Sequence, residues 1–292
     1  MDKSSLPARL APPIFVLLWS TGFIGAKMGS PYSEPMTFLS LRFAIVAVIL
    51  MIVIRVTKAP VLSLDEKLKS MFAGALIHGG YLGAVFWAID NGMPAGVSAL
   101  VVALQPMMTA VAAAWLAGMS PGRNLWIGIA VGLAGVGLVL APKINLADEG
   151  ITYATSGACA LGALSISLGT VFQKRFLPNV DLRTGTFYQY AGALFVVALV
   201  MFATERGEIA WSGPFVFALA WLVLVLSIGA IWLLMLLIRH GDVSRTASLF
   251  YLVPAATVVE GWLLFGETLS TMQIAGMVIT VVGVAIAMRV QA

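Results

Sequence analysis

The sequence has few charged residues and a single cysteine. Of its 292 residues, 17 are Lys or Arg and 13 are Asp or Glu, which together make 10% of the chain. An average soluble domain has about 25% charged residues. A water-soluble fold of this length could not cover its apolar surface with so few charges, which excludes a cytosolic enzyme, a disordered chain and a nucleic-acid binder. Cys159 stands alone, so neither an intrachain disulfide nor a cysteine-based metal cluster is possible.

Hydrophobic residues are abundant instead. They make up 60% of the chain, and the mean hydropathy is +0.99. A transmembrane helix needs about 20 mostly apolar residues, and a β-barrel would need short alternating strands. The sequence has long continuous apolar runs, such as residues 14–25 and 125–141. It therefore predicts an all-α, polytopic membrane protein.

Hydropathy, with proline and glycine at the joints, predicts ten transmembrane helices. They are expected at residues 11–28, 36–54, 69–89, 95–116, 124–141, 151–173, 184–203, 214–238, 245–265 and 270–289. The connecting loops are short, so consecutive helices must be antiparallel. No extramembrane domain fits between them.

The distribution of Lys and Arg predicts the orientation in the membrane. With a cytoplasmic N-terminus, thirteen of these residues fall on the cytoplasmic side and three outside, while Arg42 lies within a span. Cytoplasmic loops are rich in Lys and Arg, so both termini should be cytoplasmic, in a bacterial inner membrane. This bias also accounts for the net charge of +4 without an acidic partner. The N-terminus has no cleavage site after a short apolar core, so we expect it to be retained.

An internal repeat divides the chain into two halves. A shift of 148 residues superposes residues 97–140 on 245–288 without a gap. The equivalent pairs include Pro106 and Pro254, Gly128 and Gly276, and Gly135 and Gly283. Five spans precede residue 142 and five follow it, and two five-helix repeats must have opposite orientations because five is odd. The predicted domains are residues 1–142 and 143–292, arranged as the inverted repeats of many transporters.

These motifs resemble the drug/metabolite transporter superfamily in its ten-helix EamA-type form. The residues that carry the resemblance are Gly96 to Pro106 in the first half, and Tyr251 to Pro254, Leu264 to Leu269, Gln273 and Gly276 in the second. The run from His78 to Tyr81, with Trp87, resembles the amino-acid exporter branch that includes the YddG-type aromatic amino acid exporters. The first half departs from the pattern at Met119, where the repeat partner is Glu267. The resemblance implies a secondary transporter whose cavity is formed by spans 1, 3, 4, 6, 8 and 9.

Charges inside the membrane are candidates for function. Arg42 and Glu260 lie at matched depths from the outer side, which predicts either a direct charge pair or two charges beside an outer vestibule. The alternative is that Arg42 extends to the outer headgroups while Glu260 caps a wet pocket. Lys27, at the end of the first span, is expected to extend to the membrane surface.

A polar and aromatic layer near the midplane predicts the substrate site. The candidates come from six spans, each of which contributes at similar depth: Trp19, Ser20, His78, Tyr81, Gln105, Ser165, Ser227, Trp232 and Tyr251. Hydrogen bonding between helices is the alternative for any one of them. For His78 this means an imidazole bonded to a carbonyl, rather than a proton-responsive or substrate-contacting group. Pro106 and Pro254 are candidate hinges.

The function that these patterns favour is export of small metabolites by alternating access. Amino acids are the favoured substrates, aromatic and hydrophobic ones especially, and a broad-specificity drug or nucleoside-type exporter is the alternative. The sequence has neither an ATP-binding loop nor a hydrolase motif, so an enzyme is not expected. No cofactor, metal or nucleic acid is expected either. The partners are the small-molecule substrate and the lipid bilayer, and the chain should be a monomer or a weak homodimer.

Overall fold

A computed structural model describes residues 6–116, 122–140, 150–230, 233 and 249–288. Helices fill nearly all of this part of the chain, where the only β-pairing is a single bridge between Ser33 and Ile209. In chain order the elements are α1 (Leu6–Gly29), η1 (Ser30–Tyr32), α2 (Pro35–Val56), α3 (Leu64–Gly74), η2 (Ala75–Gly80), α4 (Tyr81–Asp90), α5 (Ala95–Val102), α6 (Gln105–Leu116), α7 (Arg123–Leu140), α8 (Tyr153–Phe176), α9 (Leu182–Thr204), α10 (Gly213–Ala220), η4 (Trp221–Ala230), η5 (Phe250–Leu252), α13 (Val253–Phe265) and α14 (Thr271–Met288).

The predicted all-α, polytopic architecture is confirmed. Seven helical stretches are long and apolar enough to cross a membrane. Three shorter apolar helices, Arg123–Val139, Val253–Phe265 and Thr271–Ala287, fall on the fifth, ninth and tenth expected spans. Every expected span therefore coincides with an apolar helix.

The third span starts earlier and is less regular than predicted. α3 begins at Leu64, because the Ser63 hydroxyl accepts a hydrogen bond from the Glu66 amide while the Glu66 carboxylate accepts one from the Ser63 amide. This reciprocal cap fixes the helix start before the apolar run. Further along, η2 is π-helical and carries His78. A π-helical stretch within a longer helix is frequently found at functional sites.

The fourth span is broken rather than continuous. α5 ends at Val102 and α6 begins at Gln105, with a turn at residues 103–104. Pro106 explains the break, because it has no amide hydrogen to donate back to the carbonyl one turn earlier. Within the second half of the chain, Pro254 likewise follows the short 3-10 turn η5, in the first turn of α13.

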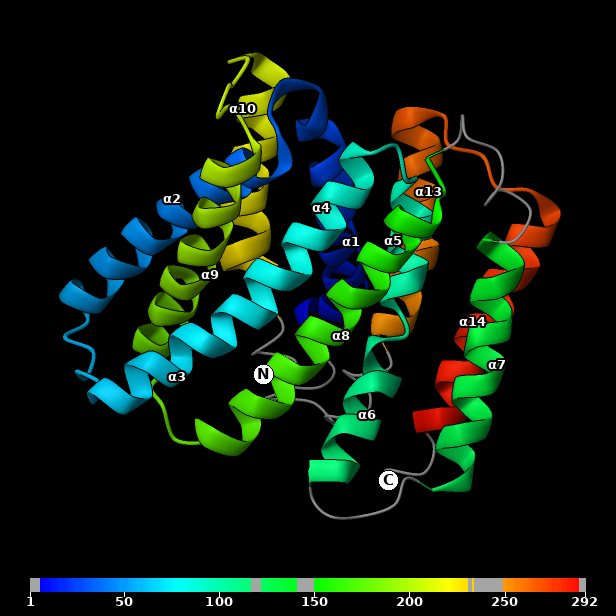
Figure 1. Ribbon diagram of the computed structural model, residues 1–292, viewed down its shortest axis with the longest axis horizontal. Helices are drawn as coiled ribbons and strands as arrows, with labels where there is room; N and C mark the ends of the chain where they lie inside the picture. Colours follow the sequence, from blue (N-terminus) through cyan, green and yellow to red (C-terminus); the bar gives the residue numbers. More distant parts are fainter. Residues whose placement is uncertain (1–5, 117–121, 141–149, 231–232, 234–248, 289–292) are drawn as a thin grey trace.

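α7 and α14 lie side by side at one edge of the molecule, as Figure 1 shows. Their backbones approach so closely that a Cβ added to Gly128 would lie 2.6 Å from the Gly283 carbonyl oxygen. A Cβ added to Gly135 would likewise lie 2.6 Å from the Gly276 carbonyl oxygen. The two contacts are equivalent under the 148-residue shift, so this helix pair is packed with pseudo-twofold reciprocity.

At the opposite edge, α2, α3 and α9 pack together (Figure 1). The N-terminus of α2 is capped by Glu205 at the end of α9, whose carboxylate accepts hydrogen bonds from the amides of Met36 at 2.8 Å and Thr37 at 2.7 Å. In return, the Glu34 carboxylate accepts a hydrogen bond from the Arg206 amide at 2.8 Å. These bonds fix the relative positions of α2 and α9, and thereby of the side chains that they direct inward.

Candidate functional site

A cavity of about 690 Å³ lies between α1, α4, α5, α6, α8 and the start of α13. It reaches from the centre of the helix bundle to Leu116, Lys174 and Arg175, which are exposed. Its walls are mainly apolar and aromatic, with a few amide, hydroxyl and charged groups: Trp19, Phe23, Tyr81, Ala99, Val102, Ala103, Gln105, Pro106, Thr109, Ala110, Ala113, Leu116, Ile166, Thr170, Val171, Lys174, Arg175, Phe250, Val253 and Pro254. Such a lining is typical of small-molecule sites.

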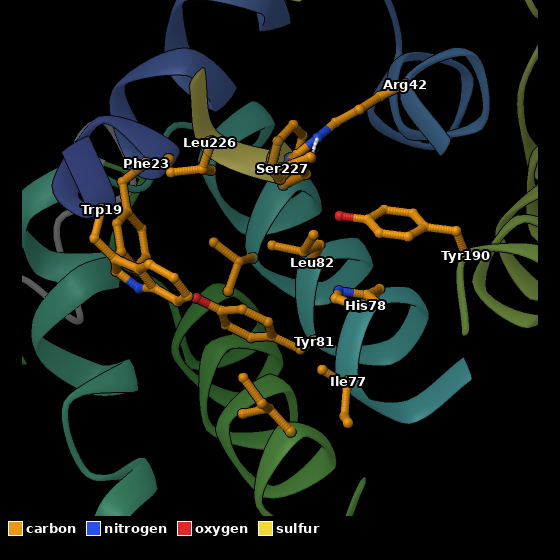
Figure 2. A pocket seen from close by; sticks show the side chains of 14 residues that line it. Trp19, Phe23, Arg42, Ile77, His78, Tyr81, Leu82, Tyr190, Leu226 and Ser227 are labelled. Carbon is orange, nitrogen blue, oxygen red and sulfur yellow. Dashed lines mark hydrogen bonds between the residues drawn. The ribbon is translucent and has the colours of Figure 1, made fainter. Parts of the chain in front are cut away.

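A smaller pocket of about 110 Å³ adjoins this cavity. Trp19, Phe23, Tyr81 and Ile166 line both spaces, so the two meet at these side chains. Figure 2 shows the smaller pocket, with Arg42 and Tyr190 on one side and Trp19 and Phe23 on the other. We use the terms large cavity and small pocket for these two spaces.

The small pocket contains a buried cation. Arg42 is only 3% exposed, and its guanidinium Nη2 and Nε donate hydrogen bonds to the Ser227 hydroxyl at 3.0 and 3.3 Å. That hydroxyl donates in turn to the Leu222 carbonyl at 3.0 Å. The remaining nitrogen of Arg42, Nη1, is buried and has no hydrogen-bond partner among the described residues. The structure thus places a positive charge and free donors against the pocket.

Aromatic rings line the two spaces near this cation. The His78 imidazole stacks on Tyr190, with 4.6 Å between ring centroids and 12° between planes. Tyr190 also meets Phe43 edge-on at 5.6 Å. At the junction of the two spaces, Trp19 packs edge-on against Phe250 at 5.2 Å. These packed rings limit side-chain movement and give the site a fixed apolar shape.

Most of the predicted site residues border the two spaces. Trp19 and Tyr81 line both, His78 and Ser227 the small pocket, and Gln105, Pro106 and Pro254 the large cavity. Two others do not border either space. The Ser20 hydroxyl donates to Glu260 at 2.7 Å, and the Ser165 hydroxyl donates to the Leu76 carbonyl at 2.9 Å. Both serines are occupied by hydrogen bonds between helices, which was the alternative for any residue of the predicted layer.

Two predicted residues have no described side chain. Trp232 lies outside the described residues. Tyr251 falls in the turn η5, and its side chain is also outside the described part.

The predicted direct pair between Arg42 and Glu260 is wrong. Arg42 bonds Ser227, whereas Oε1 of Glu260 accepts from Ser20 and its Oε2 is buried without a partner among the described residues. Matched depth did not bring the two charges together because α4 and α1 lie between α2 and α13 (Figure 1). Arg42 is instead directed into the bundle, so the alternative in which it extends to the headgroups is also wrong.

Lys27 does not simply extend to the membrane surface as predicted. Its ammonium forms an ion pair with Glu267 and lies over the Phe265 ring. The same Glu267 oxygen accepts a hydrogen bond from the Ala95 amide at 3.1 Å. The ion pair and this hydrogen bond therefore join the end of α1, the start of α5 and the residues that follow α13.

The candidate hinges stand at helix starts. Pro106 and Pro254 are each the second residue of a helix, α6 and α13. A missing amide hydrogen costs nothing there, because the first amides of a helix have no intrahelical acceptor. Both prolines border the large cavity, so the helix breaks that precede them face the same space.

Spans 2 and 7 also form walls of the site, which was not predicted. Arg42 in α2 was selected for its charge, not as a lining residue, and Tyr190 in α9 was not selected at all. Tyr190 is 2% exposed, yet it borders the small pocket. The run Phe187-Tyr188-Gln189-Tyr190 was an available signal, since two tyrosines and an amide inside an apolar span are candidates for a polar cavity.

The fold and the site define a polytopic helical membrane protein with a central, aromatic-lined cavity. Comparison with known proteins gives the family: the model of the EamA-like transporter family matches residues 13–141 and again 155–289. The chain belongs to the EamA-like transporter family.

Several bacterial proteins are similar to this chain over most of their length. The uncharacterized transporter YvbV of Bacillus subtilis is 26% identical, with 92% of this chain and 87% of that protein covered. The uncharacterized inner membrane transporter YedA of Escherichia coli K12 is 28% identical, with 88% and 82% covered. A probable amino-acid metabolite efflux pump of Salmonella typhimurium is 25% identical, with 92% and 91% covered. The family match and the apolar helices of the structure together make the chain a multi-pass membrane transporter.

One solved crystal structure has the same fold. It superposes with a TM-score of 0.65 at 22% sequence identity, and the match covers 95% of each chain.

Proposed function

We propose that this protein is a secondary transporter that exports small metabolites, most of all amino acids with aromatic or hydrophobic side chains. The observation that carries the proposal is the large cavity of about 690 Å³ with the small pocket at its inner end. Its rings suit an apolar side chain, and its amide, hydroxyl and guanidinium groups suit a polar head.

The relatives support amino acids as substrates. Two proteins that match more than nine tenths of this chain, from Salmonella typhimurium and Escherichia coli K12, are described as probable amino-acid metabolite efflux pumps. Both matches extend over 91% of the relative. Identities of 25% and 23% allow changes of lining residues, so the substrate must be tested on this chain directly.

We infer alternating access between two inverted repeats, residues 1–142 and 143–292. The family model matches once in each half, and the reciprocal glycine contacts of α7 and α14 relate equivalent residues of the halves. The large cavity extends to Lys174 and Arg175, while Lys27, Glu267 and Ala95 join three segments at the opposite ends of the helices. Both features support a conformation that is closed at the Lys27 end.

We infer that the protein lies in the inner membrane of a bacterium with both termini cytoplasmic. The thirteen-to-three distribution of Lys and Arg supports this orientation. In it, the large cavity extends toward the cytoplasm, where an exporter collects its substrate. A C-terminal fusion to a reporter that is active only in the periplasm should be inactive, and an active fusion would contradict the orientation.

Counterflow in proteoliposomes tests the function. Vesicles that contain the purified protein are preloaded with one L-amino acid at a time, for all twenty. They should accumulate the labelled form of each transported amino acid, and accumulation should be fastest for aromatic and aliphatic ones. Protein-free vesicles are the control. Exchange of nucleosides or cationic dyes without exchange of any amino acid would instead support the alternative, a broad-specificity drug or nucleoside-type exporter.

A further inference from the structure

Arg42 is a buried charge whose only described hydrogen-bond partner is neutral. An arginine side chain does not lose its proton in proteins, and a buried charge requires a counter-ion or a full set of hydrogen bonds. Among the described residues, Ser227 supplies one hydroxyl, no carboxylate contacts Arg42, and Nη1 has no acceptor. The described walls of the small pocket therefore supply no anion for Arg42.

Ser227 occupies one edge of the guanidinium, and the other edge has no partner among the described residues. Ser227 accepts from Nε and Nη2, and it is itself fixed by its bond to the Leu222 carbonyl. Nη1 and the second hydrogen of Nη2 lie together on the other edge of the fork. Two parallel N–H donors are the arrangement that binds a carboxylate through both of its oxygens. Ser227 acts here as a positioning residue.

The size of the small pocket limits what can bind beside Arg42. Its volume is about 110 Å³, which is less than the cavity of about 150 Å³ that holds one benzene molecule in a protein core. A carboxylate with its α-carbon fits this space, whereas an aromatic side chain needs the adjoining cavity of about 690 Å³. Trp19, Phe23 and Tyr81 stand where the two spaces meet.

We propose that Arg42 binds the carboxylate of the transported substrate in the small pocket, while the substrate's side chain occupies the large cavity. This inference rests on the proposed function, and it makes a carboxylate a requirement for recognition. Esters, amides and alcohols of the same amino acid are then poor ligands.

The test compares the best amino acid of the counterflow panel with its amino alcohol, in which –CH2OH replaces the carboxylate. Binding to the purified protein in detergent is measured by thermal shift over a range of concentrations. On the unmodified protein, the amino alcohol should bind about 10- to 100-fold more weakly, which corresponds to the loss of charge-assisted hydrogen bonds. Equal binding of the two ligands would overturn the inference, and this arm needs no variant.

The variant Arg42→Gln should weaken binding of the amino acid by the same factor, about 10- to 100-fold, and leave that of the amino alcohol unchanged. Arg55→Gln is the matched control, because Arg55 lies on the same helix but is exposed in its last turn. If Arg42→Gln weakened the binding of the amino acid and of the amino alcohol equally, the proposed role of the carboxylate would be overturned. If no amino acid exchanges or binds at all, the proposed function itself fails, which is a different result from amino acids that bind without need of Arg42.

Discussion

The role of a single residue in this bundle depends on whether its side chain faces a cavity or a neighbouring helix. Tyr81 and Ser165 were both predicted to line the substrate site, yet Tyr81 borders both spaces while Ser165 is bonded to the Leu76 carbonyl. A sequence gives the depth of a residue in the membrane, but its direction depends on helix rotation. Depth alone therefore cannot separate a ligand contact from a helix–helix hydrogen bond.

We expect Tyr81→Ala to lower the apparent affinity for the transported amino acid. The substitution removes a ring that borders the large cavity and the small pocket, and loss of such contact costs about 1–3 kcal/mol, or about 5- to 150-fold. Ser165→Ala is the control and should leave affinity unchanged, because Ser165 borders neither space. Substrate-dependent counterflow measures both. A normal affinity in Tyr81→Ala would mean that the substrate binds elsewhere.

Arg42 and Glu260 should contribute to stability independently. They bond to different serines, Ser227 and Ser20, and have no described partner in common. A double-mutant cycle with Arg42→Gln and Glu260→Gln, measured by thermal unfolding in detergent, should be additive within about 0.5 kcal/mol. If the double variant lost much less stability than the sum of the two single losses, a direct charge pair would be indicated and the observed hydrogen bonds contradicted.

At the scale of whole helices, close backbone contacts between α7 and α14 form one edge of the molecule. The repeat relates Gly128 to Gly276 and Gly135 to Gly283. The same four glycines form the contacts between the helices, where Gly128 meets Gly283 and Gly135 meets Gly276. In a membrane, where lipid competes for apolar side chains, close backbone approach at small residues is a main source of helix association.

Gly135→Ala should destabilise the protein by about 1–3 kcal/mol, because the new Cβ would lie 2.4 Å from the Thr280 hydroxyl and 2.5 Å from its amide nitrogen. Gly137→Ala is the same substitution two residues further along α7, where nothing lies within 4 Å. It should be neutral or slightly stabilising, since alanine favours a helix by up to about 1 kcal/mol over glycine. Thermal unfolding in detergent compares the two. Equal melting temperatures would show that α7 and α14 do not pack as described.

Glu267 should contribute both an ion pair and a backbone hydrogen bond to the contact between α1, α5 and α13. Glu267→Gln removes the charge that pairs with Lys27 but keeps an oxygen for the Ala95 amide, so it should cost about 1 kcal/mol. Glu267→Ala removes both and should cost about 1–3 kcal/mol more, because a largely buried amide loses its acceptor. The melting temperatures should fall in that order. Identical values for the two variants would mean that the Ala95 hydrogen bond contributes nothing.

The sequence predicted the helices better than their interruptions. Apolar runs of about 20 residues are a strong signal, and each expected span corresponds to a helix. The π-helical stretch with His78 and the break before Pro106 depend on which side chains pack outside the helix. Mean hydropathy carries no information on these interruptions, although Pro106 was predicted as a candidate hinge. The partners of Lys27 and Arg42 were not predicted, because each one, Glu267 or Ser227, lies more than 180 residues away in the chain.

At the scale of the whole molecule, the large cavity and the small pocket connect buried aromatic and polar side chains to one end of the helix bundle. Trp19 and Tyr81 lie where the two spaces meet, and Arg42 lines the small pocket. Lys174 and Arg175 lie at the exposed end of the large cavity. In the proposed function, the transported amino acid moves through this space. A cysteine placed in its wall should therefore report on occupancy, and the only native cysteine, Cys159, is fully buried.

Substrate protection of Thr109→Cys tests this claim most directly. Thr109 borders the large cavity, whereas Val111, two residues along α6, does not, so Val111→Cys is the control. In detergent, a bulky maleimide should label Thr109→Cys more slowly when the transported amino acid is present, and the labelled protein should lose counterflow after reconstitution. Val111→Cys should show neither effect. Labelling of Thr109→Cys that is unaffected by substrate and leaves counterflow intact would contradict transport through this cavity.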